Sequence, residues 1–367
     1  VDERHRVRRL AEATQVVVTD TVTGLVERAG VTVGRGCQLV GLARSSYYRV
    51  ARGYRHYRPV AAPVPHTARV QPAALTPAER DQIIAVLTEI DDTGEPDADQ
   101  QAWAADLSVQ QVYWRAFDAG LVGCSQRTFY RVAAGQQLVG DRRRGGHGRH
   151  GSHGRKPPAV AATRPNQLWS WDATELAGPG QERYKLMLVL DVYSRYPVRW
   201  RIEYSETTPD AVELFTTAIA QYGVPSTVHA DNGSVMRSHD LVDQLHDQGI
   251  VTSYSRPRVS DDNPFSESMF KTIKYDLSCP DRFDTIEHAR AWTETFLTRY
   301  ATEHRHSGIG HYTPAAVYHG TVDTDRARRQ AHLDRSWQSH PERFRRPPRA
   351  PAITTTGINA HLLSQEG

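Results

Sequence analysis

The sequence of 367 residues has little cysteine, with only Cys37, Cys124 and Cys279. Their odd number and irregular spacing provide no disulfide framework and indicate a reducing compartment. Long apolar runs are also missing: none approaches the length of a membrane span, and the first residues, Val1–Arg6, contain no apolar signal region. We therefore expect a cytoplasmic protein that has no membrane partner.

A large excess of one charge is absent as well. The chain has 45 Lys and Arg against 42 Asp and Glu, a formal net charge of +3. Its basic residues gather instead in residues 141–156 and again after residue 320, and locally basic segments of this kind favour contact with phosphate. The length allows two or three domains, and the hydrophobic fraction of 39% is sufficient for a core but somewhat low, which indicates additional extended segments.

The middle of the chain contains the pattern of a β-sheet. Residues 167–175 and 183–204 predict three consecutive strands, of which Val198–Tyr204 alternates strictly between apolar and polar side chains. Residues 186–190 form a continuous apolar run, which is typical of a strand covered on both faces. This pattern puts Asp172 in the middle of the first strand.

Helices and strands then alternate. Thr208 supplies an N-cap and Pro209 a first-turn proline for a helix that Gly223 can end, and a short strand over residues 226–230 leads directly to Asp231. Asn232-Gly233 is a turn signal that stops this strand. A second helix over residues 241–248 and a strand near residues 250–254 follow. Because ligands bind at the carboxyl ends of strands in α/β sheets, Asp231 stands at a chemically useful position.

A third acid lies on a later helix. Residues 264–275 predict a helix on which Lys271 lies about 40° and Lys274 about 20° from Glu267, whereas Met269 and Ile273 face the opposite way. An acid that ligates Mg²⁺ beside lysines that hold phosphates suits a helix that processes DNA. The alternative is an ordinary solvated Glu-Lys pair. Singly, Asp172 is equally compatible with a surface strand position and Asp231 with a turn.

Taken together, these acids resemble the DDE catalytic core of retroviral integrases and insertion-sequence transposases. Asp172 and Asp231 are separated by 58 residues, and the gap of 35 residues between Asp231 and Glu267 matches that family's signature. Asp231-Asn-Gly matches its second motif, and His304–Tyr318 is similar to the segment that closes the core in bacterial elements of the IS-three family. The resemblance covers residues 164–320.

The resemblance implies an α/β fold: an RNase H-like mixed five-stranded sheet flanked by helices, preceded by small all-α helix-turn-helix modules. It implies that Asp172, Asp231 and Glu267 hold two Mg²⁺ or Mn²⁺ ions, one activating the attacking oxygen and the other stabilising the leaving oxygen at phosphorus. Water would nick the end of the element, and the freed 3′-hydroxyl would attack a second DNA site. The paired His and Cys ligands of the retroviral zinc module are not found, so zinc is not expected.

The implied partners are DNA, as terminal inverted repeats and target, and further copies of the chain in a homo-oligomer on DNA, with a nucleoid-associated location. We hypothesise a transposase, with two alternatives: a DNA-binding regulator without turnover, and a nuclease of the same fold that never joins strands. Three further acids are not expected to be ligands. Asp191 would pair with Arg195 or support the site, and Asp261 and Asp262 would shape the entry to the Glu267 helix.

Residues 1–60 predict a first helix-turn-helix module. A helix ends near Gly41, and Ser45 can cap another. Ser46, Tyr47 and Arg49 of that second helix, with Arg44 just before it, offer hydroxyls and cations to a DNA groove.

Residues 61–140 predict a second module. Thr76 and Glu79 form a capping box around Pro77, and residues 123–131 repeat the phrase of the first module. Its candidate DNA contacts are Arg127, Thr128 and Arg131. A short helical bundle that only packs onto a neighbour is the alternative.

Residues 141–163 predict a basic linker rich in Gly, His and Arg. Its glycines disfavour a packed core, and Arg142, Arg143 and Arg144 favour phosphate contact. The histidines at 147, 150 and 153 raise a metal hypothesis, but flexible flanks favour a solvated linker. Residues 164–320 form the catalytic core, and residues 321–367 predict a mostly extended Arg- and Pro-rich tail that binds DNA or a partner.

Overall fold

The computed structural model describes residues 2–51, 73–88, 108–138, 158–256 and 262–365. The chain divides into two compact units, Val1–Gln71 and Pro72–Gly367. Each unit has its own hydrophobic core and is treated separately. Among the described residues, every helix is too short or too polar to cross a lipid bilayer.

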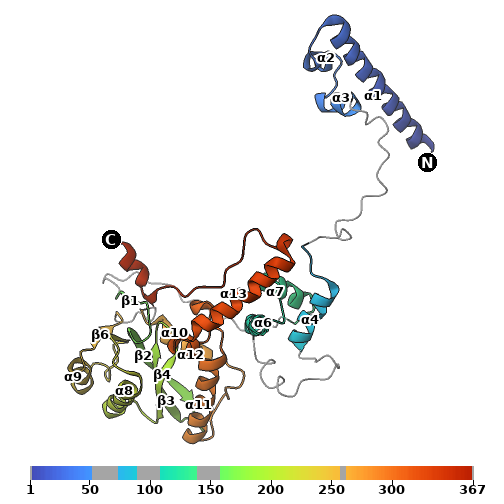
Figure 1. Ribbon diagram of the computed structural model, residues 1–367. Coiled ribbons are helices and arrows are strands. Elements are labelled where there is room, and N and C mark those ends of the chain that lie inside the picture. The colour runs from blue at the N-terminus through green and yellow to red at the C-terminus, as the bar shows by residue number, and fades with distance from the viewer. Residues whose placement is uncertain (1, 52–72, 89–107, 139–157, 257–261, 366–367) are drawn as a thin grey trace. The chain divides into compact units, whose positions relative to one another are not determined.

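The first unit consists of three helices, α1 (Asp2–Ala29), α2 (Val33–Leu39) and α3 (Arg44–Ala51) (Figure 1). Its core is small and contains Val22, Cys37 and Tyr47. Helix α3 begins at Arg44, one residue before the expected cap Ser45, so Ser45 lies in its first turn. The capping prediction is therefore wrong, while the pair of short helices is as predicted.

The second unit contains a five-stranded mixed sheet in the order β4-β3-β2-β5-β6. Strand β2 pairs antiparallel with β3, β3 pairs antiparallel with β4, and β2, β5 and β6 run parallel. The bounds are β2 (Leu168–Ala177), β3 (Arg183–Asp191), β4 (Pro197–Glu203), β5 (Thr227–Ala230) and β6 (Val251–Tyr254). This is the topology of the RNase H-like fold, so the predicted fold class is confirmed.

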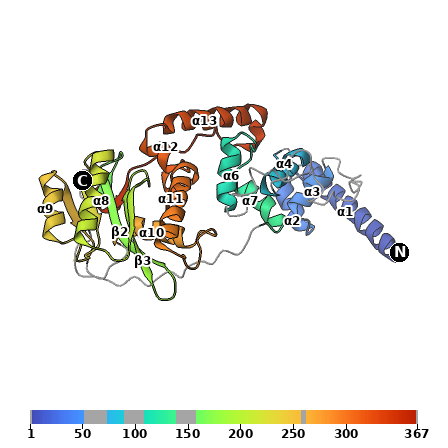
Figure 2. The same ribbon diagram turned by 90° about the horizontal axis from the view of Figure 1, so that it is seen from below.

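Helices cover both faces of this sheet (Figure 2). One face packs against α8 (Thr208–Tyr222) and α9 (His239–Asp247), around Trp171 and Phe215. The other packs against α10 (Pro264–Lys274) and α11 (Ile286–Glu303), around Leu188 and Phe270. Because side chains alternate along a strand, consecutive residues of β2 face these two layers in turn. We call residues 158–319, which include α12 (Pro314–Tyr318), the sheet domain.

The second unit also contains a second helical module, residues 73–138. Its helices are α4 (Pro77–Thr88), α6 (Val109–Asp118) and α7 (Gln126–Gly135). The predicted capping box is present, since the Thr76 N–H donates to Glu79 at 2.7 Å and the Glu79 N–H donates to the Thr76 hydroxyl at 3.2 Å. Ser125 caps α7 by accepting from the Thr128 N–H.

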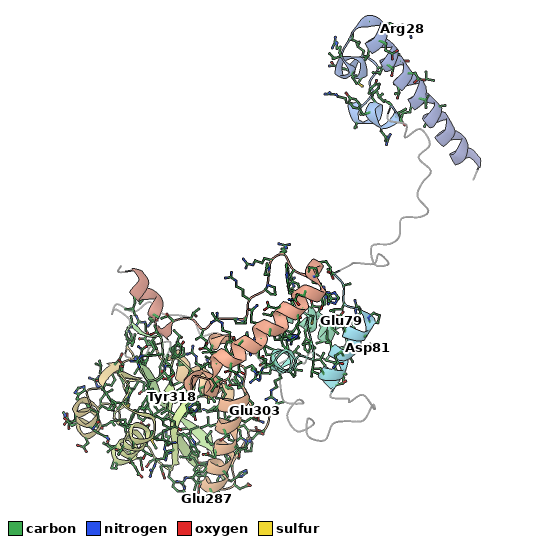
Figure 3. The ribbon with its side chains drawn as sticks, viewed as in Figure 1. Arg28, Glu79, Asp81, Glu287, Glu303 and Tyr318 are labelled. Carbon is green, nitrogen blue, oxygen red and sulfur yellow. The ribbon has the colours of Figure 1, made fainter. Side chains whose placement is uncertain are left out.

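The tail is where the structure departs most from the sequence prediction. Residues Val322–Ser339 form the 18-residue helix α13, and β7 (Thr356–Ile358) pairs antiparallel with β1 (Val160–Ala162). In both views α13 runs from α12 to α6 and α7 (Figures 1 and 2). The expectation of a mostly extended tail is therefore wrong, because this segment has partners far away in the sequence. One of them is Glu79, labelled in Figure 3, which pairs with Arg343 at 2.6 Å.

Two partly buried histidines predict that acid destabilises the second unit. Burial, followed by nearby arginines, lowers the pKa of His304 to about 4 and that of His306 to about 3. The unfolded chain binds these protons near pH 6.5, so stability is complete above that pH and is lost as the pH falls toward the folded values. At pH 5 we expect a loss of about 1 to 2 kcal/mol for each histidine.

Urea denaturation at pH 7.5 and pH 5 measures this loss. His304→Gln should lose less unfolding free energy between pH 7.5 and pH 5 than the parent, by about 1 to 2 kcal/mol, the amount expected for one histidine. His288→Gln is the matched control, because the His288 side chain on α11 is 43% exposed, and it should behave as the parent. An equal loss in the parent and in His304→Gln would contradict the assignment.

Candidate active site

Asp172 and Asp231 stand at the same level on neighbouring parallel strands. The register pairs Trp171 of β2 with Ala230 of β5, and each acid is the next residue along its chain. Neighbouring strands lie about 4.8 Å apart, so this pairing alone brings the two carboxylates close together. Both are oriented by backbone: Asp172 Oδ1 accepts from the Ala173 N–H and Asp231 Oδ1 from the Gly233 N–H, each at 2.8 Å.

The helix that carries Glu267, α10, is hydrogen-bonded to β2, the strand that contains Asp172. Ser170, two residues before Asp172 and on the same face of β2, donates to Asn263 Oδ1 at 2.6 Å, and its hydroxyl lies 2.5 Å from that of Ser266. Asn263 also donates to the Trp171 carbonyl at 3.3 Å. Since Ser266 directly precedes Glu267, these buried bonds hold the third acid at the level of the first.

The charges of these acids interact. Burial, followed by the charges of Asp231, Glu267 and Glu206, raises the pKa of Asp172 to about 7. Burial and the charge of Asp231 also raise the pKa of Glu206, which lies between β4 and α8. The site therefore collects four negative groups at one end of the sheet. Sequence analysis missed Glu206; its only signal was its position beside Thr207, the residue that caps α8.

The donor set fits a hard divalent cation. Carboxylate oxygens are the ligands that Mg²⁺ prefers, and among the described residues Asp172, Asp231 and Glu267 take part in no ion pair that would neutralise them. Within the described parts of the chain, no group of three acidic, His or Cys side chains is arranged to hold a metal ion. The three carboxylates therefore lie farther apart than the ligands of one bound ion. The acids are neighbours whose mutual repulsion a cation would relieve.

Removing the Ser170 hydroxyl tests how α10 is held. Ser170→Ala leaves buried polar groups of Asn263 and Ser266 without their partner, so we expect a loss of about 1 to 3 kcal/mol in the free energy of unfolding. Ser268→Ala is the control, because Ser268 is exposed on the same helix. Equal stabilities of the two variants in urea titrations would show that the Ser170 bonds do not fasten α10.

Two other acids have structural partners. Asp191 is buried and accepts from the Asn166 N–H and from both the N–H and the hydroxyl of Ser194, so it shapes the β3-β4 turn. Asp262 forms a two-point ion pair with Arg256, at 2.9 and 3.0 Å, immediately before α10. Asp262 therefore shapes the entry to α10, as expected. That neither acid is a ligand stays a prediction. Asp261 lies outside the described residues.

The candidate DNA contacts are distributed over three helices. On α10, Lys271 and Lys274 are exposed on the side of Glu267, while Met269 and Ile273 are buried. Of the candidates on α3 and α7, those that are at least partly exposed are Arg44, Ser46, Arg49, Arg127, Thr128 and Arg131. Tyr47 is buried in the core of the first unit, where its hydroxyl lies 3.3 Å from that of Thr23. Its ring therefore packs α3 onto α1. Arg142, Arg143 and Arg144 lie outside the described residues.

Comparison with known families identifies the domain that these acids belong to. Residues 162–260 match one model described as an integrase core domain, and residues 248–314 match a second model with the same description. The matched residues contain Asp172, Asp231 and Glu267, together with all five strands of the sheet.

Curated relatives include transposases of insertion sequences. The chain is 32% identical over 158 residues to the transposase of IS904 from Lactococcus lactis and 29% identical over 156 residues to transposase InsF of IS3A from Escherichia coli. These segments cover 42% of this chain and 61% and 54% of the relatives, so the chain spans little more than half of their length.

Solved structures of similar fold are catalytic cores of retroviral integrases. One, from HTLV-2 in complex with magnesium, is 20% identical with a TM-score of 0.35, and another, from BIV, is 20% identical with a TM-score of 0.34. Both comparisons cover 43% of this chain, and 99% and 97% of the respective cores.

Proposed function

We propose that this chain, which carries the integrase core domain found in transposases of IS3-type insertion sequences, cuts DNA at the ends of such an element and joins the freed ends to a second DNA site. One observation carries the proposal. Asp172 and Asp231 follow a paired position on adjacent parallel strands, and the helix of Glu267 is bonded to the same strand.

In this proposal Asp172, Asp231 and Glu267 hold two Mg²⁺ or Mn²⁺ ions. When bound, the ions supply Lewis acidity to the attacking and leaving oxygens of an in-line displacement at phosphorus. The acids themselves contribute fixed negative charge, and the burial of Asp172 increases the electrostatic gain from each cation.

The chemistry has two balanced steps. In the first, a water oxygen bonds to the phosphorus at the element's end, the P–O3′ bond breaks, and the leaving oxygen takes a proton to become a 3′-hydroxyl. In the second, that 3′-oxygen bonds to a target phosphorus and a target 3′-oxygen leaves. Neither step requires a covalent bond to the protein.

Lys271 and Lys274 are proposed to hold DNA phosphates beside the acids. Each phosphate neutralised by a lysine releases a counterion and adds about 0.9 to the slope of log affinity against log salt. Changing both lysines to glutamine should therefore lower that slope by about 2 and weaken binding on all sequences alike. Fluorescence anisotropy of labelled DNA, at salt concentrations from about 50 to 200 mM, measures the affinity and its salt slope.

Lys185→Gln is the matched control for this prediction. Lys185 on β3 pairs with Glu175 on β2 at 2.8 Å. Its loss should therefore leave the slope of log affinity against log salt close to that of the parent. An unchanged slope in the double variant of α10 would remove both lysines from the DNA interface.

The proposed function is tested with a supercoiled plasmid that carries the DNA flanking the gene. With Mg²⁺ we expect nicks at the ends of the element and products joined to a second DNA. Binding without nicks would favour a regulator, and nicks without joined products would favour a nuclease. Either result would overturn the proposal.

A further inference from the structure

A buried arginine on α13 joins the second helical module to the sheet domain. Arg329 is 1% exposed, and its guanidinium donates to both oxygens of Asp118 on α6, at 2.5 and 3.0 Å. The same guanidinium donates to the carbonyls of Gly310 and His311 in the sheet domain, at 2.8 and 2.5 Å. One side chain therefore connects three separate segments of the chain.

Aromatic rings fix the plane of this guanidinium. It lies 4.7 Å from the centre of the Trp114 ring, which belongs to α6, and 4.1 Å from that of Tyr312, which belongs to the sheet domain. The Trp114 ring also stacks on His311, with centres 4.6 Å apart. A planar cation with several directed donors, held by two rings, has little freedom to rotate, which lysine could not reproduce.

Further polar contacts surround this centre. Gln111 on α6 exchanges two hydrogen bonds with the backbone of Arg305, at 2.7 and 2.9 Å. The Arg305 side chain adds a second cation to Asp118, at 2.8 Å. Arg115 pairs at 2.6 Å with Glu303, the last residue of α11, which Figure 3 labels.

The same module carries the helix that we expect to contact DNA. Helix α7 packs on α6 through Phe129, which is fully buried and lies 5.4 Å from the Tyr113 ring between ring centres. The Tyr113 hydroxyl donates to the Cys124 carbonyl at 3.0 Å, just before α7. Arg127 and Arg131 remain exposed on α7. If α6 keeps one position relative to the sheet domain, α7 therefore keeps one as well.

We propose that Arg329 is a positioning residue: through Asp118 it locks the second helical module to the sheet domain, so that DNA held by α7 presents one particular phosphodiester to the acids. The part of this proposal that concerns DNA rests on the proposed function. The locking itself does not, because it is a property of the free protein. Without such a lock, relative motion of neighbouring modules is the ordinary expectation.

The lock is tested first without DNA. Spin labels at Ala134→Cys on α7 and Asp247→Cys on α9, in a chain whose three native cysteines are alanine, report the distance between module and sheet domain. We expect one narrow distribution in the parent and a broadening of about twofold or more in Arg329→Met. Arg329→Lys should fall between them. Arg328→Met, the matched control, changes an exposed neighbour that pairs with Asp325 and should match the parent.

The positioning role is tested next on DNA that carries the element's end. Mapping of the nicked phosphodiester should give one position for the parent and for Arg328→Met, and several positions for Arg329→Met and Arg329→Lys. A purely structural role would lower the yield at the parent's position and would not move it. That outcome, or a narrow distance distribution in both Arg329 variants, would overturn the proposal. If the parent cuts no DNA, the proposed function fails, and the distance measurement still decides whether the lock exists.

Discussion

Changing Asp231 to asparagine is expected to reduce DNA cutting and joining by about a thousandfold, because metal-ion catalysis supplies several kcal/mol and each 1.36 kcal/mol is a factor of ten in rate. Asparagine keeps an oxygen that can accept from the Gly233 N–H, as Asp231 does at 2.8 Å. The turn should therefore survive while the charge is lost. Single-turnover rates with Mg²⁺ on end-bearing DNA measure the effect.

The control for this variant is Asp243→Asn, which removes an exposed acid from α9. It should cut and join at a rate close to the parent's. DNA binding should be retained in both variants, since neither substitution removes a basic side chain that would contact phosphate. Cutting by Asp231→Asn at a rate within a few fold of the parent would remove this acid from the catalytic set.

The second large effect concerns stability. Asp118→Ala should lower the free energy of unfolding of the second unit by about 3 to 5 kcal/mol, because it leaves buried cations without their counter-charge. Arg329 is 1% exposed, and Arg305, which shares the same carboxylate, is largely buried as well. Urea titration followed by tryptophan fluorescence measures the loss. Trp114, whose ring contacts Arg329, reports on the contact between the second helical module and the sheet domain, which we call the junction.

Asp325→Ala provides the contrast, because Asp325 pairs on α13 with Arg328, whose side chain is 56% exposed. An exposed ion pair contributes about 0 to 1 kcal/mol. If Asp118→Ala cost no more than Asp325→Ala, the junction would be a surface contact and would hold nothing in place.

The sheet and its acids could be predicted from sequence because their signals are local. Alternation over Val198–Tyr204 and the apolar run at residues 186–190 report directly on strand burial. Turn and cap residues such as Gly223 and Asn232-Gly233 mark where elements end. The strand that contains Asp172 and the end of the strand that precedes Asp231 then determine where these two acids lie.

The junction could not be predicted, because its partners are far apart in sequence. Asp118 and Arg329 are separated by 211 positions, and an arginine-rich segment reads as solvated unless its counter-charge is known. The same limit applies to Ser170, whose bonds to Asn263 and Ser266 appear only once α10 lies on β2. Tyr47 is a different case: a unit of three helices has so small a core that one aromatic ring becomes part of it.

The central claim is that Asp172, Asp231 and Glu267 form one divalent-metal site. Anomalous diffraction from crystals soaked in Mn²⁺ tests it most directly. We predict an anomalous peak for a Mn²⁺ ion within ligand distance of oxygens of Asp172 and Asp231, and a second Mn²⁺ peak beside Glu267. The peak between the two aspartates should be lost in Asp231→Asn. A peak at another place in the chain, or none between these carboxylates at millimolar Mn²⁺, would contradict the account.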